Sequence, residues 1–226
     1  MRILVFIALV MLFSQAQALL MLNSSEINEE QKQVISFTQF ANSPTMTQGP
    51  VEVDSTAGVT VQWSGVNTND NAYIGNDSYY SLGNNGVWNT SAEGYTALNN
   101  STGSIRYTFN QDVSSVGAFM NYLPDSNNHV TVTAYNRSGQ VIETYDINNL
   151  APISTFRGTN QGAFRGIQRT MADIAMFEVS NSYVVLDHLS YGITTYTPEP
   201  SSLFMALAGM AGGLLALRKN RKMQKS

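Results

Sequence analysis

The segment Ser104-Ile-Arg-Tyr-Thr-Phe-Asn110 carries the pattern that decides the fold. Its apolar residues Ile105, Tyr107 and Phe109 alternate with the polar residues Arg106 and Thr108. Because successive side chains of a strand point to opposite faces, the segment predicts a strand with one buried and one wet face. Eight further segments with a period of two are also predicted as strands: Val34–Phe40, Gly58–Val66, Ser115–Leu123, His129–Asn136, Gln140–Ile147, Ala163–Gln168, Ile174–Ser180 and Tyr183–Tyr191.

The clearest connection between two of these strands is a hairpin. The strand that begins at His129 is joined to the strand that begins at Gln140 by Asn136-Arg-Ser-Gly139, whose glycine suits the left-handed position of such a loop. No helical stripe interrupts the strands. Residues 34–195 therefore predict an all-β ectodomain, an antiparallel β-sandwich of jelly-roll type, and we expect residues 19–33 to form a polar lead-in.

The N-terminus has the three parts of a secretory signal peptide. Met1 and Arg2 are followed by an uninterrupted apolar run, Ile3 to Phe13, and then by Ala16-Gln17-Ala18 with the small residues that signal peptidase requires. An N-terminal membrane anchor is the alternative, but a run of 11 apolar residues is well short of the roughly 20 needed to span a bilayer. We expect residues 1–18 to be removed between Ala18 and Leu19.

The C-terminus has a second three-part segment, which covers residues 197–222. Pro198-Glu199-Pro200 precedes an uncharged, mostly apolar stretch, residues 201–217, which is long enough for a short transmembrane helix. A basic cluster over residues 218–222 follows, with Arg218, Lys219, Arg221 and Lys222. By the positive-inside rule this cluster would stay in the cytoplasm, so the middle of the chain is expected outside the inner membrane.

This order of a PEP motif, a Gly-containing apolar helix and an Arg/Lys cluster closely resembles the PEP-CTERM sorting signal of Gram-negative bacteria. The resemblance implies recognition by an exosortase, an integral-membrane cysteine transpeptidase-like enzyme. It further implies processing near Pro198-Glu199-Pro200 and delivery to the cell surface or to an exopolysaccharide matrix. A plain single-pass anchor with a chance PEP triplet is the alternative.

The middle of the chain also resembles an ectodomain that is common in PEP-CTERM proteins. The resemblance rests on Tyr80-Ser-Leu-Gly-Asn-Asn-Gly-Val-Trp88, Ser115-Val-Gly-Ala-Phe-Met-Asn-Tyr122, Leu150-Ala-Pro-Ile-Ser154, Gly162-Ala-Phe-Arg-Gly-Ile167 and Val185-Leu-Asp-His-Leu189. Such domains commonly have two acidic residues or Asp-Asn at the final strand, whereas this chain has Asp187-His188. The resemblance implies a location and no reaction.

Composition excludes several classes of function. The chain has no Cys and 2 His, so disulfides, thiolate nucleophiles and Cys-based metal sites are excluded. Residues 19–197 carry 6 basic and 15 acidic side chains, and a domain of this charge would repel nucleic acid. We find no Gly-x-Ser-x-Gly elbow, no His-Glu-x-x-His motif and no phosphate loop. A non-enzymatic protein is therefore expected.

Two low-specificity patterns suggest binding sites. Tyr73, Tyr79, Tyr80 and Trp88 lie among Asn, Asp and Ser residues, and flat rings beside amides suit a sugar-binding face, although cores use the same residues. Asp187 lies in an apolar strand and could ligate a structural calcium, or be exposed or hydrogen-bonded at a strand edge. His188 is expected on the opposite face from Asp187.

The sequence thus predicts an exported protein with a structural or adhesive role in an exopolysaccharide matrix. Its expected partners are signal peptidase, exosortase, the membrane through the C-terminal helix and, as a further hypothesis, exopolysaccharide. A carbohydrate-binding module is the main alternative, and a glycoside hydrolase is a weaker one, since nothing fixes the spacing of two catalytic carboxylates.

Overall fold

The computed structural model describes residues 18–28, 30–76, 94–123, 127–153 and 162–193. Within them the chain forms fourteen strands and one short α-helix. The strands are β1 Ala18–Met21, β2 Lys32–Ile35, β3 Thr45–Met46, β4 Val51–Asp54, β5 Val61–Val66, β6 Ala72–Asn76, β7 Gly94–Leu98, β8 Ser104–Val113, β9 Ser115–Asn121, β10 Thr131–Tyr135, β11 Val141–Asp146, β12 Ala163–Arg169, β13 Ile174–Ser180 and β14 Val185–Gly192. The helices are α1 Ile147–Leu150 and the 3-10 turns η1 Ser24–Glu26, η2 Thr38–Phe40 and η3 Thr56–Gly58.

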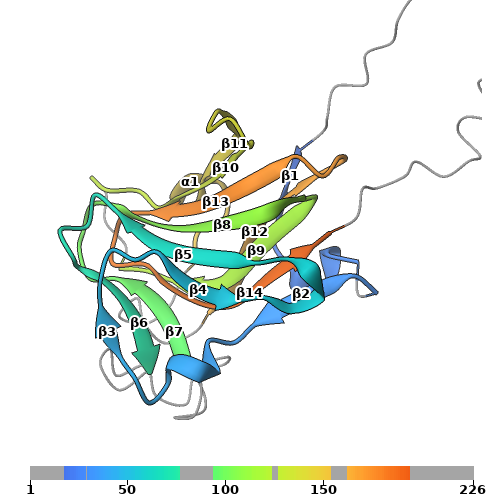
Figure 1. Ribbon diagram of the computed structural model, residues 1–226. Helices are drawn as coiled ribbons and strands as arrows, with labels where there is room; N and C mark the ends of the chain where they lie inside the picture. The colour runs from blue at the N-terminus through green and yellow to red at the C-terminus, as the bar shows by residue number, and fades with distance from the viewer. Residues whose placement is uncertain (1–17, 29, 77–93, 124–126, 154–161, 194–226) are drawn as a thin grey trace, which may run out of the picture. The chain divides into compact units, whose positions relative to one another are not determined.

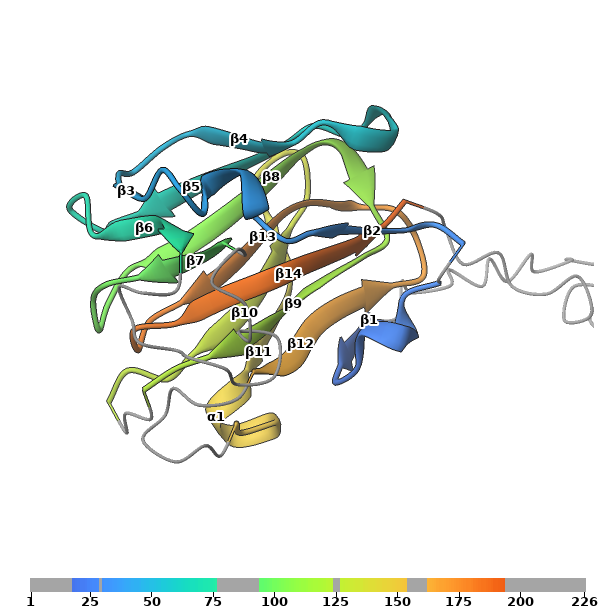
Figure 2. The same ribbon diagram turned by 90° about the horizontal axis from the view of Figure 1, so that it is seen from below.

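The strands form two antiparallel sheets that face each other (Figure 1). The eight-stranded sheet has the order β1-β12-β9-β14-β7-β6-β3, and β2 pairs with β14 beyond the end of β7. Figure 2 shows β14 near the middle of this sheet, between β9 and β7. The six-stranded sheet has the order β11-β10-β13-β8-β5-β4. The all-β sandwich predicted from the sequence is therefore confirmed.

The core lies between the sheets, and two tyrosine hydroxyl groups form hydrogen bonds from one sheet to the other. Ile105, Tyr107 and Phe109, the apolar residues of the alternating segment, are all fully buried there. The Tyr107 hydroxyl of the six-stranded sheet lies 2.5 Å from the Thr96 hydroxyl of the eight-stranded sheet. Tyr191 donates in the reverse direction, from β14 to Asp54 Oδ2 of β4 at 3.0 Å. The hydroxyl groups of Tyr107 and Tyr191 thus each have a hydrogen-bond partner on the opposite sheet, as buried polar groups require.

All nine predicted strands correspond to observed strands, with differences at their ends. The predicted hairpin is confirmed: β10 pairs with β11, and Gly139 adopts a φ of 79°. The segment Val34–Phe40 is strand only as far as Ile35, because Phe37 adopts a left-handed φ of 54° and begins η2. The prediction omitted five strands, β1, β3, β4, β6 and β7.

Residues 19–33 do not form a separate polar lead-in as expected, because two of their segments are strands of the eight-stranded sheet. β1 pairs with β12 along its whole length, and β2 pairs with the end of β14. Met21 and Ile27 are fully buried and pack with Phe164 in a small cluster of their own. The segment is polar overall, but these two apolar side chains give it enough buried surface to dock on the sheet.

The first strand, β1, begins at the same end of the sandwich at which the last strand, β14, ends. Leu19 pairs with Gln168, Gln168 with Ser115, and Ser115 with Gly192, so all four residues lie in one row across β1, β12, β9 and β14. Adjacent strands are about 4.8 Å apart, which separates Leu19 from Gly192 by about 14 Å. We call the end of the sandwich that carries this row the exit end.

Candidate functional site

An open groove of about 430 Å³ lies at the opposite end of the sandwich, on the outer face of the six-stranded sheet. This volume is in the range of small-molecule sites. Apart from one glycine, its lining consists of side chains that carry hydroxyl, amide or carboxylate groups: Asn67, Thr102, Gly103, Ser104, Thr131, Glu178, Ser180 and Asn181. The groove therefore offers hydrogen bonds and almost no apolar surface.

The sheet register explains why these residues meet. Thr131 pairs with Ser180, and Ser180 pairs with Ser104, so three neighbouring strands each bring one hydroxyl group to the same row. Glu178 lies two residues back along β13 and faces the same side. The groove is thus a direct product of the alternation on these three strands, in which one face of each strand fills the core and the other face stays polar.

The charge of Glu178 is compensated within the sheet. Its side chain is mostly buried, and the whole residue is only 8% exposed. Arg106 lies beside it on β8 and donates from Nε to Oε2 at 2.7 Å, while Nη2 is 2.5 Å from the same oxygen. The pair is therefore close to neutral overall, as a buried carboxylate requires.

Tyr135 completes this group from β10. Its hydroxyl donates to Glu178 Oε1 at 3.4 Å, and the Arg106 guanidinium lies over its ring, 5.2 Å from the ring centre. Burial and then the neighbouring Glu178 carboxylate raise the pKa of Tyr135, so the phenol remains a donor at neutral pH. The long bond leaves Oε1 with unused acceptor capacity beside the groove.

The loops at the rim of the groove are tied to one another by backbone hydrogen bonds. Asn181 N donates to Gly103 O at 2.9 Å, and Ser182 N donates to Ser101 O at 3.0 Å. Asn181, Ser182 and Tyr183 all have left-handed backbones, with φ of 74°, 54° and 54°. Such residues are uncommon in runs and persist only where the surroundings fix them. The rim is therefore held in one conformation.

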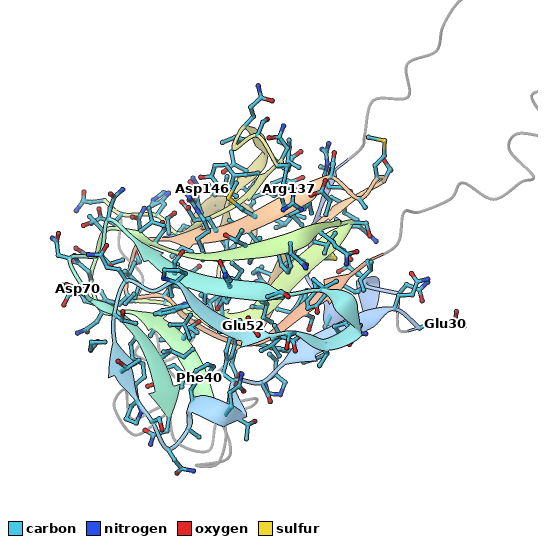
Figure 3. The ribbon with its side chains drawn as sticks, in the orientation of Figure 1. Glu30, Phe40, Glu52, Asp70, Arg137 and Asp146 are labelled. Atoms are coloured by element: carbon cyan, nitrogen blue, oxygen red, sulfur yellow. The ribbon has the colours of Figure 1, made fainter. Side chains whose placement is uncertain are left out.

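The groove and the exit end lie at opposite ends of β14. Asn181, a groove residue, directly precedes the turn into β14, whereas Gly192 is the last residue of that strand. Figure 3 labels Asp70, in the loop beside Asn67 at the groove end, and Glu30 at the other end of the sandwich. The groove therefore lies at the end of β14 opposite to the point where the chain leaves that strand.

The aromatic residues predicted as a sugar-binding face are placed only in part. Tyr73 is described, and it is 3% exposed; its ring packs 5.5 Å from that of Tyr95, and its hydroxyl donates to Asn76 O at 3.0 Å. A ring buried in this way belongs to the packing of the sheet and has no free face for a sugar. Tyr79, Tyr80 and Trp88 lie outside the described residues.

The structure corrects the expected orientation of His188. A β-bulge between Asp187 and Ser190 and a left-handed His188, with φ of 49°, turn the imidazole back toward its neighbour. His188 Nδ1 lies 3.0 Å from Asp187 Oδ2, and His188 N donates to Asp187 Oδ1 at 2.6 Å. The two side chains therefore occupy one site instead of opposite faces.

This geometry bears on the predicted calcium ligand. Asp187 is 1% exposed, and both of its carboxylate oxygens face nitrogen atoms of His188. His188 N thus donates one hydrogen bond to this buried carboxylate, which lies on a strand paired on both sides, and the calcium role of Asp187 stays a prediction. Nowhere in the described parts of the chain do three or more His, Asp or Glu side chains gather as they would around a metal ion.

The residues predicted for sorting lie almost wholly outside the described residues. Pro198, Glu199, Pro200, Arg218, Lys219, Arg221 and Lys222 are all outside them, as is Ala16. Ala18 is described and is the first residue of β1, paired with Arg169. Within the described ranges no helix is long and apolar enough to cross a membrane, and the predicted helix at residues 201–217 is not among them.

Comparisons with known proteins give only weak similarity to solved structures. No family model matches the chain, and no curated protein matches it. The K1 cleaved adhesin domain of Lys-gingipain from Porphyromonas gingivalis W83 is similar with a TM-score of 0.40 and 14% identity, over 72% of this chain and 98% of that one. The K2 cleaved adhesin domain of Lys-gingipain gives a TM-score of 0.39 and 10% identity, over 72% and 99% of the two chains.

Proposed function

We propose that this chain is an exported protein that exosortase processes and that serves a structural or adhesive role at the cell surface or in an exopolysaccharide matrix. Signal peptidase removes residues 1–18, and residues 197–222 hold the protein in the inner membrane until processing. The exported part is a jelly-roll type sandwich without catalytic activity. Its acidic surface gives it no role in binding nucleic acid.

The observation that supports this proposal is the position of Leu19, at the start of β1, and Gly192, at the end of β14. An export intermediate with a signal peptide and a C-terminal membrane helix is held at one membrane by both ends. Leu19 and Gly192 lie in the same row of the sheet, so both segments can leave from one end of a folded domain.

The reach of the chain after β14 can be compared with the length of that strand. From Ile193 to Pro198 the chain has five steps, which reach at most about 17 Å. If β14 ran in the opposite direction, the chain would leave from the groove end and would first have to return along an eight-residue strand, a distance of about 26 Å. The short connection thus lets the proposed membrane segment start close to the end of the sandwich where β1 begins.

Mass spectrometry of the mature protein from exosortase-positive cells tests the proposal. The expected N-terminal peptide begins at Leu19, and no peptide is expected from beyond Pro200. The variant Glu199→Ala should retain the C-terminal peptides, whereas the control Ser202→Ala should be processed normally. An intact Arg218-Lys219 end in the wild-type protein from these cells would overturn the proposal.

A further inference from the structure

We infer that the groove at the end of the six-stranded sheet is a binding site for a neutral saccharide. The carrying observation is the convergence of three strand hydroxyl groups, two asparagines and the compensated Glu178 carboxylate in one open cavity. The inference does not depend on exosortase sorting, which concerns other parts of the chain.

The charge of the groove selects the class of ligand. Glu178 is the only charged residue in the lining, and Arg106 neutralises it from the adjacent strand. A cation would meet a carboxylate whose charge Arg106 already neutralises, and an anion would approach that same carboxylate without a free positive partner. A neutral ligand meets neither penalty.

The lining also distinguishes a saccharide from a peptide. Peptide recognition needs apolar pockets for side chains or an unpaired strand edge. The groove has no apolar side chain in its lining, and β8, β10 and β13 are all paired on both sides. Neighbouring hydroxyl groups on a sugar ring need closely spaced donors and acceptors, which Thr131, Ser180 and Glu178 Oε1 supply.

The rigidity and position of the groove support the same conclusion. The left-handed run Asn181-Ser182-Tyr183 is fixed by backbone hydrogen bonds, and the Ser182 hydroxyl also donates to Asn128 O. A fixed rim reduces the entropy that is lost when a flexible polar ligand binds. The groove lies at the opposite end from the exit row, so an attachment through the C-terminus leaves it accessible.

Affinity electrophoresis of the full chain in detergent tests the site. The native gels contain dextran, galactomannan or xyloglucan as neutral probes, and polygalacturonate as an anionic one. We expect retardation in at least one neutral gel, unchanged by 0.5 M salt, and none in polygalacturonate. Failure in all three neutral gels, or retardation by polygalacturonate that salt removes, would overturn the inference. The mass-spectrometric test of sorting can succeed or fail independently.

Two variants locate the site. Thr131→Val removes one groove hydroxyl with little change of shape and should weaken retardation about 3- to 10-fold. The control Thr108→Val, on the same outer face but outside the lining, should bind as the wild type. Glu178→Gln leaves Arg106 uncompensated and should gain retardation in polygalacturonate. Equal binding by Thr131→Val and wild type would contradict this location of the site.

Discussion

In β7 of the eight-stranded sheet all five residues are buried, whereas in β8 of the six-stranded sheet buried residues alternate with half-buried and exposed ones. The outer face of the first sheet is apolar around Tyr73, Tyr95, Ala97 and Val185. The outer face of the second is polar around Arg106 and Glu178. Side chains on the first face are thus needed for the fold, while those on the second are available to a ligand.

The largest test of this difference is Tyr95→Ala. Tyr95 is fully buried against Tyr73 and Val185, and we expect the free energy of unfolding to fall by about 3–5 kcal/mol. The matched control is Tyr135→Ala on the other outer face, where the half-buried ring contacts Arg106 and the loss should be about 1 kcal/mol. Urea denaturation measures both. Equal losses would mean that the two faces do not differ in this way.

A smaller effect is expected from Gly94→Ala. A Cβ at Gly94 would collide with the backbone oxygen of Phe37, whose side chain belongs to the core between the sheets. Overpacking against backbone should lower the free energy of unfolding by about 2–3 kcal/mol. In the hairpin of the six-stranded sheet, Gly139 has nothing within 4 Å of such a Cβ and a φ of 79°, so Gly139→Ala should cost only about 1 kcal/mol, from backbone strain.

Thermal unfolding curves should place Gly94→Ala clearly below Gly139→Ala. The reverse order would show that the close approach of η2 to β7 does not exist in solution.

The bond between the sheets gives the next prediction. Burial raises the pKa of Tyr107, although its hydrogen bond with Thr96 partly opposes this, so the phenol stays protonated and bonded. Tyr107→Phe should reduce the free energy of unfolding by about 1–2 kcal/mol, because it leaves a buried hydroxyl without this partner. Tyr183→Phe, at a residue 40% exposed, should change it by less than about 0.5 kcal/mol. Comparable losses would argue against the inter-sheet bond.

The same contrast explains what the sequence could predict. Alternation is visible wherever one face is wet, and for that reason β8, β10 and β13 were predicted correctly. β6 and β7 are short and buried on both faces, so their apolar and polar residues do not alternate with a period of two. Each also contains a glycine, Gly75 or Gly94. Such segments cannot be distinguished by period from other short apolar runs.

The candidate sites show a further limit. Sequence periodicity assigned Asp187 and His188 to opposite faces, and the bulge that brings them together leaves no local pattern in Val185-Leu-Asp-His-Leu189. The groove was also not predicted, because Thr131, Ser180 and Ser104 become neighbours only through strand pairing. Alternating Thr and Ser on three predicted strands was the available signal, but the strand order was needed to use it.

The smallest expected effect is a pH dependence at the edge of the six-stranded sheet. Partial desolvation raises the pKa of Asp146, but hydrogen bonds from His129 and Asn149 outweigh it and leave the pKa below its ordinary value of 3.8. His129 Nδ1 lies 2.8 Å from Asp146 Oδ2, and Asn149 Nδ2 donates to the same oxygen at 2.7 Å. The ionised carboxylate therefore stabilises the folded state.

Because the folded-state pKa is lowered, this stabilisation is complete above the ordinary pKa of 3.8 and is lost as the pH falls through the lower folded-state value. The difference in unfolding free energy between wild type and Asp146→Asn should be constant from pH 7 to about pH 5 and should shrink below about pH 4. Asn149→Ala should remove part of this dependence, since it deletes the Nδ2 donor, whereas the backbone N–H of residue 149 still donates to Asp146 Oδ1. Urea denaturation at each pH measures the difference, and parallel curves down to pH 2 would show that the folded carboxylate has its ordinary pKa.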